Sequence, residues 1–305
     1  MPGFIQASPL QRIHSRFFAD LEVWIKRDDM LHPVVSGNKF RKLKYSLPAL
    51  SATGASTIVS MGGPWSNHLH ALAYACKERG LSSIGLIRGL RKPSDPLTPT
   101  LQDCLAQGMK LQFVSRDDYR TLRDSDSYWR QILEFDLQGH SWLPEGGSST
   151  LALRGVSEIV VEVQQALGGD PDFVICACGT GTTLAGIVAG LAGRGTAIGI
   201  AALANADFLN TKVNQLLEQA HYPNYTNFET VKEFDHGGFA KTTPALIEFC
   251  QEFEQETMIP LEPVYTGKMM YAVAQLCRQG RFSPQQKIVL LHTGGLQGRR
   301  GFTQT

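Results

Sequence analysis

The segment CACGTGTTLAGIVAGL, residues 176–191, indicates the class of fold. An apolar run at residues 173–177 predicts a strand, and the small residues of CGTGTT separate it from a helix that runs through Leu191. Backbone N–H groups in such a turn, at a helix N-terminus, form an anion site. The turn lacks the Lys-Ser/Thr ending of a P-loop, and its glycines do not fit G-x-G-x-x-G. A phosphate without a nucleotide fits better, and the alternative is an ordinary tight strand-to-helix turn.

Strands and helices alternate on both sides of this segment. The predicted strands are residues 57–60, 83–87, 110–114, 173–177, 197–201 and 287–291, and the predicted helices are 67–80, 97–108, 156–167, 243–256 and 267–279. Such alternation is typical of parallel sheets with crossover helices. We expect two open, twisted α/β units, with residues 116–126 at the surface and 204–242 unassigned.

The composition narrows the class of protein. A chain of 305 residues with 43% hydrophobic and 19% charged residues supports a sizeable core, either in two domains or in one large one. A net charge of +1, from 29 basic and 28 acidic residues, gives no support for nucleic acid or a membrane surface as a partner. The N-terminal MPGFIQASPLQRIHSRF lacks signal-peptide features, and no apolar stretch is long enough to cross a bilayer. The six scattered cysteines indicate reduced thiols, so we expect a cytoplasmic protein without a metal.

A second glycine-containing strand end occurs in SMGGPWSNHLHALAYA, residues 60–75. Ser66 and Asn67 are natural N-caps of the helix that follows. The free N–H groups at this helix start can also receive a carboxylate. His68 and His70 are expected to be ordinary helix residues rather than metal ligands.

Two later segments also place polar side chains where a predicted strand ends or a predicted helix begins. In EPVYTGKMMYAV, residues 262–273, Tyr265 lies just before a predicted helix, where a phenol can face a cleft; the alternative is a half-buried structural tyrosine. In VLLHTGGLQG, residues 289–298, Thr293 follows an apolar strand. Ligands of open α/β sheets gather at the carboxyl ends of the strands.

The segment VVSGNKFRKLKY, residues 34–45, supplies a chemical group for such a site. Helical spacing places Lys39 and Lys42 on one face. A lysine near two glycine-containing anion loops suits pyridoxal phosphate, a carbonyl cofactor with a phosphate handle. A solvated helix face is the alternative for the lysines alone.

Taken in order, these segments resemble the 1-aminocyclopropane-1-carboxylate deaminase/D-cysteine desulfhydrase family. The resemblance runs through SPLQRI, IKRDDMLHPVVSGNKFRKLKY, MGGPWSNHLHA, PEGGSS, CGTGTTLAG, VYTGKMMYAV and LHTGG. It implies an α/β protein of pyridoxal-phosphate fold type II, similar to the tryptophan synthase β chain, with the cofactor in an interdomain cleft. We expect a large domain of residues 1–42 and 141–305 and a small domain of residues 43–140.

The resemblance also implies roles for individual residues. Lys39 matches the Schiff-base lysine and Lys42 a phosphate contact, while Ser66 and Asn67 match the site of the substrate carboxylate. Ser66 is further implied in proton transfer, and Asn67 is implied to lie near the 3-hydroxyl of the cofactor. Tyr265 matches a tyrosine that faces the substrate. Phosphate binding is implied for Gly179, Thr180, Gly181, Thr182 and Thr183, and the predicted substrate pocket also includes Trp65, His68 and Phe239.

Two positions bear on the reaction. Where the deaminases of the family have Glu and Leu, this chain has Thr266 and Thr293, as is typical of the desulfhydrases. A neutral hydroxyl leaves the pyridine a weaker electron sink, which favours β-elimination over ring opening. Phe239 replaces a second family tyrosine, and Trp65 replaces the Gln of the deaminases, so the pocket is more apolar and the substrate stays open.

We therefore expect a lyase that converts D-cysteine to pyruvate, hydrogen sulfide and ammonia, in a chain that forms a homodimer. The alternatives are a 1-aminocyclopropane-1-carboxylate deaminase or another fold type II amino-acid deaminase or racemase. A non-catalytic protein that binds a small anion is the lesser alternative.

Overall fold

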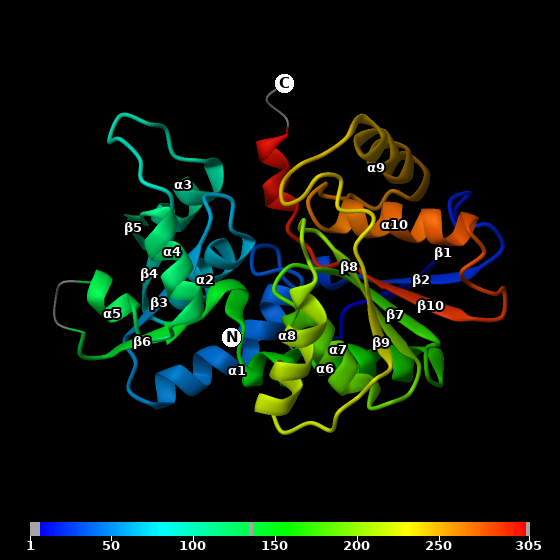
Figure 1. Cartoon of the computed structure of the whole chain (residues 1–305), viewed down its shortest axis with the longest axis horizontal. Coiled ribbons are helices and arrows are strands. Elements are labelled where there is room, and N and C mark those ends of the chain that lie inside the picture. Colours follow the sequence, from blue (N-terminus) through cyan, green and yellow to red (C-terminus); the bar gives the residue numbers. More distant parts are fainter. Residues whose placement is uncertain (1–6, 134–136, 303–305) are drawn as a thin grey trace.

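A computed structural model describes residues 7–133 and 137–302 as two sheets with helices on both faces of each (Figure 1). Residues 1–6, where the segment examined for a signal peptide begins, lie outside the described residues. The larger sheet has the order β1-β2-β10-β7-β8-β9 and is parallel except for the antiparallel pair of β1 and β2. Its strands are β1 (Leu10–Ile13), β2 (Glu22–Lys26), β7 (Phe173–Cys178), β8 (Thr196–Ala201), β9 (Phe228–Val231) and β10 (Lys287–Leu291).

Alternate side chains of the larger sheet point to its two faces and pack into two separate hydrophobic cores. Ile175 of β7 and Ile288 of β10 pack with α9 and α10, whereas Val174 and Val289 pack with α6, α7 and α8. All four side chains are fully buried, as expected for strands that are covered on both faces. The helices are α6 (Thr150–Leu167), α7 (Thr182–Leu191), α8 (Phe208–Gln219), α9 (Pro244–Thr257) and α10 (Thr266–Arg278).

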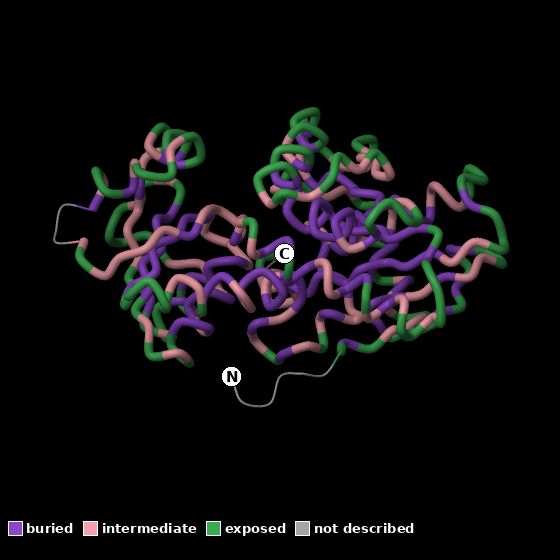
Figure 2. Tube along the Cα trace, turned by 90° about the horizontal axis from the view of Figure 1, so that it is seen from below, coloured by how far each residue is buried: buried purple, intermediate pink, exposed green. Residues whose placement is uncertain are grey.

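The smaller sheet is parallel throughout, with the order β5-β4-β3-β6. Ile58 of β3 packs toward α1, α2 and α3, and Val59 packs toward α4 and α5. In Figure 2 the buried part of the trace runs through the middle of both units, and exposed segments lie at the outer helices and loops. The strands are β3 (Thr57–Gly62), β4 (Ser82–Arg88), β5 (Lys110–Val114) and β6 (His140–Leu143), and the helices are α1 (Asn38–Ala52), α2 (Asn67–Glu78), α3 (Pro99–Ala106), α4 (Arg116–Asp124) and α5 (Trp129–Ile132).

The α/β class and the predicted strands are confirmed, and several details differ. The helix expected at 156–167 begins at Thr150, where Ser149 caps it by accepting the N–H of Ala152. The segment predicted to be surface, 116–126, contains the helix α4, which buries Tyr119 and Leu122. The unassigned region 204–242 holds α8 and β9.

The division into two domains stays a proposal, which the sheets refine. Helix α1 spans the boundary expected between residues 42 and 43, and β6 adds residues 141–143 to the smaller sheet. We therefore propose that the chain crosses between the units within α1 and again just after Leu143. The chain also contains three short 3-10 helices, η1 (Asp28–Met30), η2 (Glu145–Gly147) and η3 (Leu296–Gly301). Over the described ranges, no helix combines the length and apolar character that a membrane span needs.

Candidate active site

The N-terminus of α1 is held by a buried ion-pair network. The guanidinium of Arg41 donates to Asp28 at 2.9 Å and to Glu162 at 2.5 Å, and both Arg41 and Asp28 are almost completely buried. The carbonyl of Asp28 accepts the N–H of Gly37 at 2.9 Å. Because Gly37 is the N-cap of α1, these bonds set where the helix starts and thus where Lys39 points.

Lys39 is half-buried and lies next to the larger sheet's phosphate-type turn. Its Nζ donates to Asn38 Oδ1 at 3.2 Å, and Asn38 Nδ2 donates to Thr183 Oγ1 at 2.9 Å. Burial lowers the pKa of Lys39 to about 8, against the opposing charge of Glu262. A depressed pKa makes the neutral, nucleophilic amine accessible near physiological pH.

The turn after β7 carries the features of an anion site. Gly181 has φ +78° and begins α7, whose first residues are Thr182 and Thr183. Thr180 and Thr182 share a hydrogen bond of 3.1 Å, and Thr182 donates to Ser148 Oγ at 2.9 Å. The hydroxyls of Thr180, Thr182 and Ser148 are therefore grouped at the helix N-terminus, where an anion is favoured.

Lys42 brings a buried positive charge to this turn. Its Nζ donates to the carbonyl of Gly146 at 3.4 Å, and Gly146 lies against the side chain of Thr180. Burial, followed by the charge of Lys39, lowers the pKa of Lys42 well below its ordinary value. A bound anion would offset both effects, so the site is electrostatically suited to a phosphate.

His68 is buried beside the two lysines. Its Nε2 is 2.8 Å from Ser60 Oγ, while Nδ1 has no partner within the described residues and faces the backbone at Gly147. Burial and the charges of Lys39 and Lys42 lower its pKa well below the ordinary value, so the ring is neutral. Residues 7–133 and 137–302 contain no group of His, Cys, Asp or Glu that is arranged to hold a metal ion.

The loop after β3 leads into the N-terminus of α2. Ser66 is the N-cap of α2, and its Oγ accepts the N–H of Leu69 at 3.2 Å. Asn67 Oδ1 accepts from Gln297 Nε2 at 2.9 Å, and its amide nitrogen lies against Gly295. The ring of Trp65 packs against Gly301 of η3, and its place in the substrate pocket stays a prediction.

Tyr265 connects the turn to the last predicted pocket residue. It caps α10, and its ring and hydroxyl lie beside the α-carbon of Gly179. The ring of Phe239 is 6.1 Å from that of Tyr265 in an edge-to-face arrangement. Burial, followed by the negative charges of Glu262 and Glu145, raises the pKa of Tyr265, so its hydroxyl keeps its proton.

The two threonines that bear on the reaction differ in their surroundings. Thr266 is fully buried, and its hydroxyl donates to the carbonyl of Glu262 at 3.1 Å and accepts that residue's N–H at 3.0 Å. Thr293 follows β10 and is 8% exposed, with its backbone carbonyl against Gly37. The backbone of Thr293 therefore packs against the N-cap residue of α1.

Sequence analysis missed the acidic residues of this site. The carboxylate of Glu262 accepts the N–H groups of Val264, Tyr265 and Thr266, and burial raises its pKa. The signal in the sequence is an acidic residue shortly before a helix start, in EPVYT, because a carboxylate there can accept the free N–H groups. Glu145, in PEGGSS, accepts from the hydroxyl of Tyr119 and pairs with Arg123, both on α4.

The residues present fit pyridoxal phosphate. The threonine-rich turn and the side chain of Lys42 suit a phosphate, whose charge would favour the ammonium form of Lys42, and the amine of Lys39 suits an aldehyde. The buried Nδ1 of His68, which has no partner within the described residues, leaves unsatisfied hydrogen-bonding capacity beside these groups.

The comparisons with known proteins agree with this fit. The model of a family described as pyridoxal-phosphate dependent enzyme matches residues 3–294. The bifunctional D-cysteine desulfhydrase/1-aminocyclopropane-1-carboxylate deaminase of Arabidopsis thaliana is 28% identical over 91% of this chain and 73% of its own. The 1-aminocyclopropane-1-carboxylate deaminase of Burkholderia vietnamiensis is 27% identical over 97% of this chain and 93% of its own.

Solved structures show the same fold. A crystal structure described as that of an ACC deaminase homologue superposes with a TM-score of 0.81 at 25% identity, and covers 97% of this chain and 91% of its own. A hydrogen sulfide-producing enzyme from Fusobacterium nucleatum superposes with a TM-score of 0.69 at 14% identity, and covers 97% of each chain. The second likeness concerns the fold alone.

Proposed function

Because this chain belongs to the pyridoxal-phosphate-dependent enzyme family, we propose that it catalyses β-elimination from a small amino acid, as in D-cysteine desulfhydrase. With D-cysteine and one water, the products are pyruvate, hydrogen sulfide and ammonia. We propose further that the enzyme is cytoplasmic, which fractionation of cells tests, and that it is a homodimer, which light scattering of the purified protein tests.

The residues that hold the cofactor follow from the contacts of the site. Lys39 would bond to its aldehyde, Lys42 and the Gly179–Thr183 turn would hold its phosphate, and Asn67 would lie beside its ring. When bound, the cofactor supplies an aldehyde that condenses with amino groups and a ring that withdraws electrons from the substrate α-carbon.

Three parts of the site would act on the substrate: the start of α2, the amine of Lys39 and the hydroxyl of Tyr265. The N–H groups at the start of α2 and the hydroxyl of Ser66 bind the substrate carboxylate. The amine of Lys39 takes the α-proton, for which its lowered pKa suits it. Tyr265 keeps its proton, so its hydroxyl can donate a hydrogen bond to the departing thiolate while the carbon–sulfur bond breaks with the electron pair on sulfur, and the thiolate takes its proton from water.

The observation that carries β-elimination is the neutral environment at Thr266. Its hydroxyl already pairs with the backbone of Glu262, and the carboxylate of Glu262 accepts the N–H groups of Val264, Tyr265 and Thr266. Where the deaminases of the family have a carboxylate to hold a proton on the pyridine nitrogen, this chain has the neutral hydroxyl of Thr266. A pyridine without that proton withdraws electrons less strongly, which suffices to expel a thiolate but disfavours opening a cyclopropane.

Substrate profiling of the purified, yellow holoenzyme tests the proposal. We expect ammonia and sulfide in equal amounts from D-cysteine, with a higher kcat/KM than for 1-aminocyclopropane-1-carboxylate. A faster release of ammonia from the cyclopropane substrate would overturn it.

Deamination of 1-aminocyclopropane-1-carboxylate is the second candidate. The names of several relatives favour it, among them the Burkholderia vietnamiensis enzyme. The same assay separates the two reactions, because ring opening yields ammonia without sulfide. A panel of D- and L-amino acids covers the other deaminases and racemases.

A further inference from the structure

Four parallel strands of the smaller sheet end at one edge, and each places different chemistry there. β3 leads into the loop of Ser66, and β6 leads into Glu145. β4 ends at Arg88, and β5 leads into α4. Since ligands of such sheets bind beside the carboxyl ends of the strands, this edge extends the proposed substrate site.

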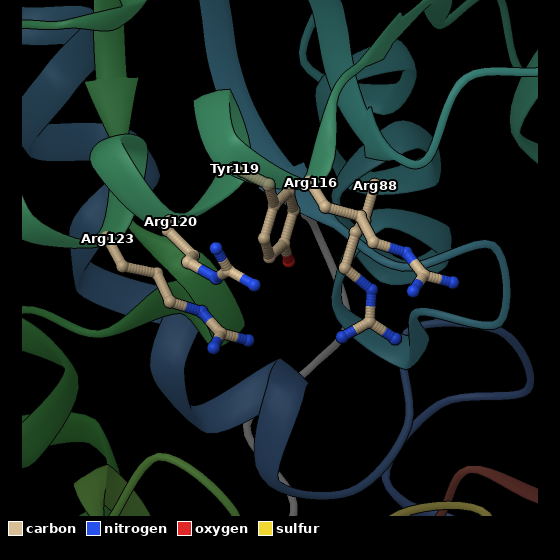
Figure 3. A pocket seen from close by; sticks show the side chains of 5 residues that line it. All are labelled: Arg88, Arg116, Tyr119, Arg120 and Arg123. Carbon is tan, nitrogen blue, oxygen red and sulfur yellow. The ribbon is translucent and has the colours of Figure 1, made fainter.

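A pocket of about 370 Å³ lies at this edge and is lined by Arg88, Arg116, Tyr119, Arg120 and Arg123. Figure 3 shows the ring of Tyr119 between Arg120 and Arg123 on one side and Arg88 and Arg116 on the other. Arg88 and Arg123 also lie over the ring of Tyr119, at 5.7 and 5.1 Å from its centre. The pocket thus gathers four guanidinium groups around one aromatic ring.

The positive charge of the pocket is only partly neutralised. Arg123 pairs with Glu145 at 2.8 Å, and Arg120 pairs with the exposed Asp117 at 2.7 Å. Arg88 and Arg116 have no acidic partner among residues 7–133 and 137–302. Two of the four guanidinium groups therefore remain available to an anion, and a guanidinium binds carboxylate or sulfonate groups through paired hydrogen bonds.

The pocket adjoins the proposed substrate site on two sides. Arg88 Nη2 is 3.7 Å from the position that a Cβ of Gly63 would occupy, and Gly63 belongs to the same loop as Ser66. On the other side, the carboxylate of Glu145 accepts from Tyr119 Oη at 2.5 Å, and the next carbonyl, that of Gly146, accepts from Lys42. Glu145, which binds Tyr119 in the wall of the pocket, is thus the neighbour in sequence of Gly146, which binds the predicted phosphate contact Lys42.

We propose that this pocket binds a second negative charge on the substrate, so that the preferred substrate is an amino acid whose side chain ends in a carboxylate, sulfonate or phosphate. The proposal rests on the β-elimination proposed for the same site. The α-carboxylate binds at the start of α2, and the distal anion binds Arg88 and Arg116. Phe239 beside Tyr265 is apolar, which makes the arginine pocket the charged end of the proposed substrate site.

Kinetics with matched substrate pairs test the proposal. The holoenzyme is assayed with pairs of β-substituted alanines that have similar size, one neutral and one anionic, in both configurations at Cα. We expect the anionic member to be favoured in kcat/KM by about tenfold, the factor that corresponds to about 1.4 kcal/mol. In the double variant Arg88→Gln/Arg116→Gln, this ratio should fall about tenfold, whereas Arg130→Gln, an exposed arginine on the same unit, should keep the wild-type ratio.

A binding measurement keeps the result independent of turnover. Calorimetry with inorganic sulfate should show binding to the wild-type holoenzyme and to Arg130→Gln, and weaker binding to the double variant. Equal kcat/KM ratios in the wild type and the double variant, or equal sulfate binding, would overturn the inference and leave β-elimination intact. If no amino acid of the panel is eliminated while sulfate binding still depends on the two arginines, the proposed reaction fails and the anion pocket stands.

Discussion

The α-carbon of Gly37 lies against the backbone carbonyl of Thr293, so closely that a Cβ on Gly37 would overlap that oxygen. Gly37 also has φ +64°, a conformation that other L-residues rarely adopt. The start of α1, which carries Lys39, can therefore pack against the residue after β10 only because Gly37 has no Cβ.

Gly37→Ala should therefore separate Lys39 from the rest of the site. The change combines backbone strain of about 1–2 kcal/mol with an overpacking cost of about 1–3 kcal/mol. We expect a lower midpoint of urea unfolding and a lower content of bound cofactor, measured by visible absorption. Gly54→Ala is the matched control, since Gly54 has φ +86° and no neighbouring atom within 4 Å. Full cofactor loading of Gly37→Ala would contradict the packing argument.

Lys39→Ala should abolish the visible absorption of the lysine-bound cofactor. It should also lower kcat by about 10²–10⁴-fold, because the α-proton loses its acceptor. Lys44→Ala is the matched control, since Lys44 lies on the same helix and pairs at the surface with Glu158. A Lys39→Ala protein that keeps both the absorption and full turnover would refute the assignment.

The pH dependence of cofactor uptake should report the amine of Lys39. Since burial lowers its pKa to about 8, the neutral amine prevails above that pH and is lost below it. The rate at which apoprotein gains visible absorption should rise about tenfold per pH unit below the pKa and level off above it. Stopped-flow measurements between pH 7 and 10 check this, and a rate that keeps rising toward pH 10 would indicate an ordinary, exposed lysine.

Local patterns in the sequence predicted the parts of the fold that are locally encoded. The buried strands β7 and β10 are apolar runs, FVICAC and KIVLL, and such runs are recognisable wherever their partners lie. The strand β2 was not predicted, because its pairing of Glu22 with Lys287 joins distant parts of the chain. Its short, mixed sequence, EVWIK, is a strand paired with β1 on one side and with β10 on the other.

The same limit applies to the site. Lys39 and the threonine turn stand in motifs whose residue types suggest their chemistry. The arginine pocket has no motif, because Arg88 comes from the end of β4 and Arg116, Arg120 and Arg123 from α4. In the sequence, residues 116–126 indicate only a polar surface, and the convergence of these arginines depends on the order of the strands.

Phe239→Tyr should shift the balance between the two candidate reactions. Phe239 is 41% exposed and faces Tyr265, so a hydroxyl fits there at a cost within about 0.5 kcal/mol of unfolding free energy. The added phenol supplies a second proton donor. We expect kcat/KM for 1-aminocyclopropane-1-carboxylate to rise relative to D-cysteine, while Phe208→Tyr, at a site of similar exposure, leaves the ratio unchanged. An unchanged ratio in Phe239→Tyr would show that this position does not select the reaction.

Lys268 should determine how well the segment that carries Phe239 is ordered. Its buried Nζ donates to the carbonyls of Asp235 at 2.7 Å, Gly238 at 2.6 Å and Ala202 at 3.3 Å. Lys268→Met leaves these carbonyls without their donor, which should cost about 1–3 kcal/mol of unfolding free energy. It should also speed hydrogen exchange at residues 235–240.

The exposed Lys110→Met serves as the control, with an expected change within about 0.5 kcal/mol. If Lys268→Met lowers the unfolding midpoint but leaves exchange at residues 235–240 as in the wild type, then the lysine stabilises α10 rather than the segment. If both change, and the kcat/KM of D-cysteine falls with them, then the position of Phe239 beside Tyr265 depends on one ammonium group that itself touches no substrate.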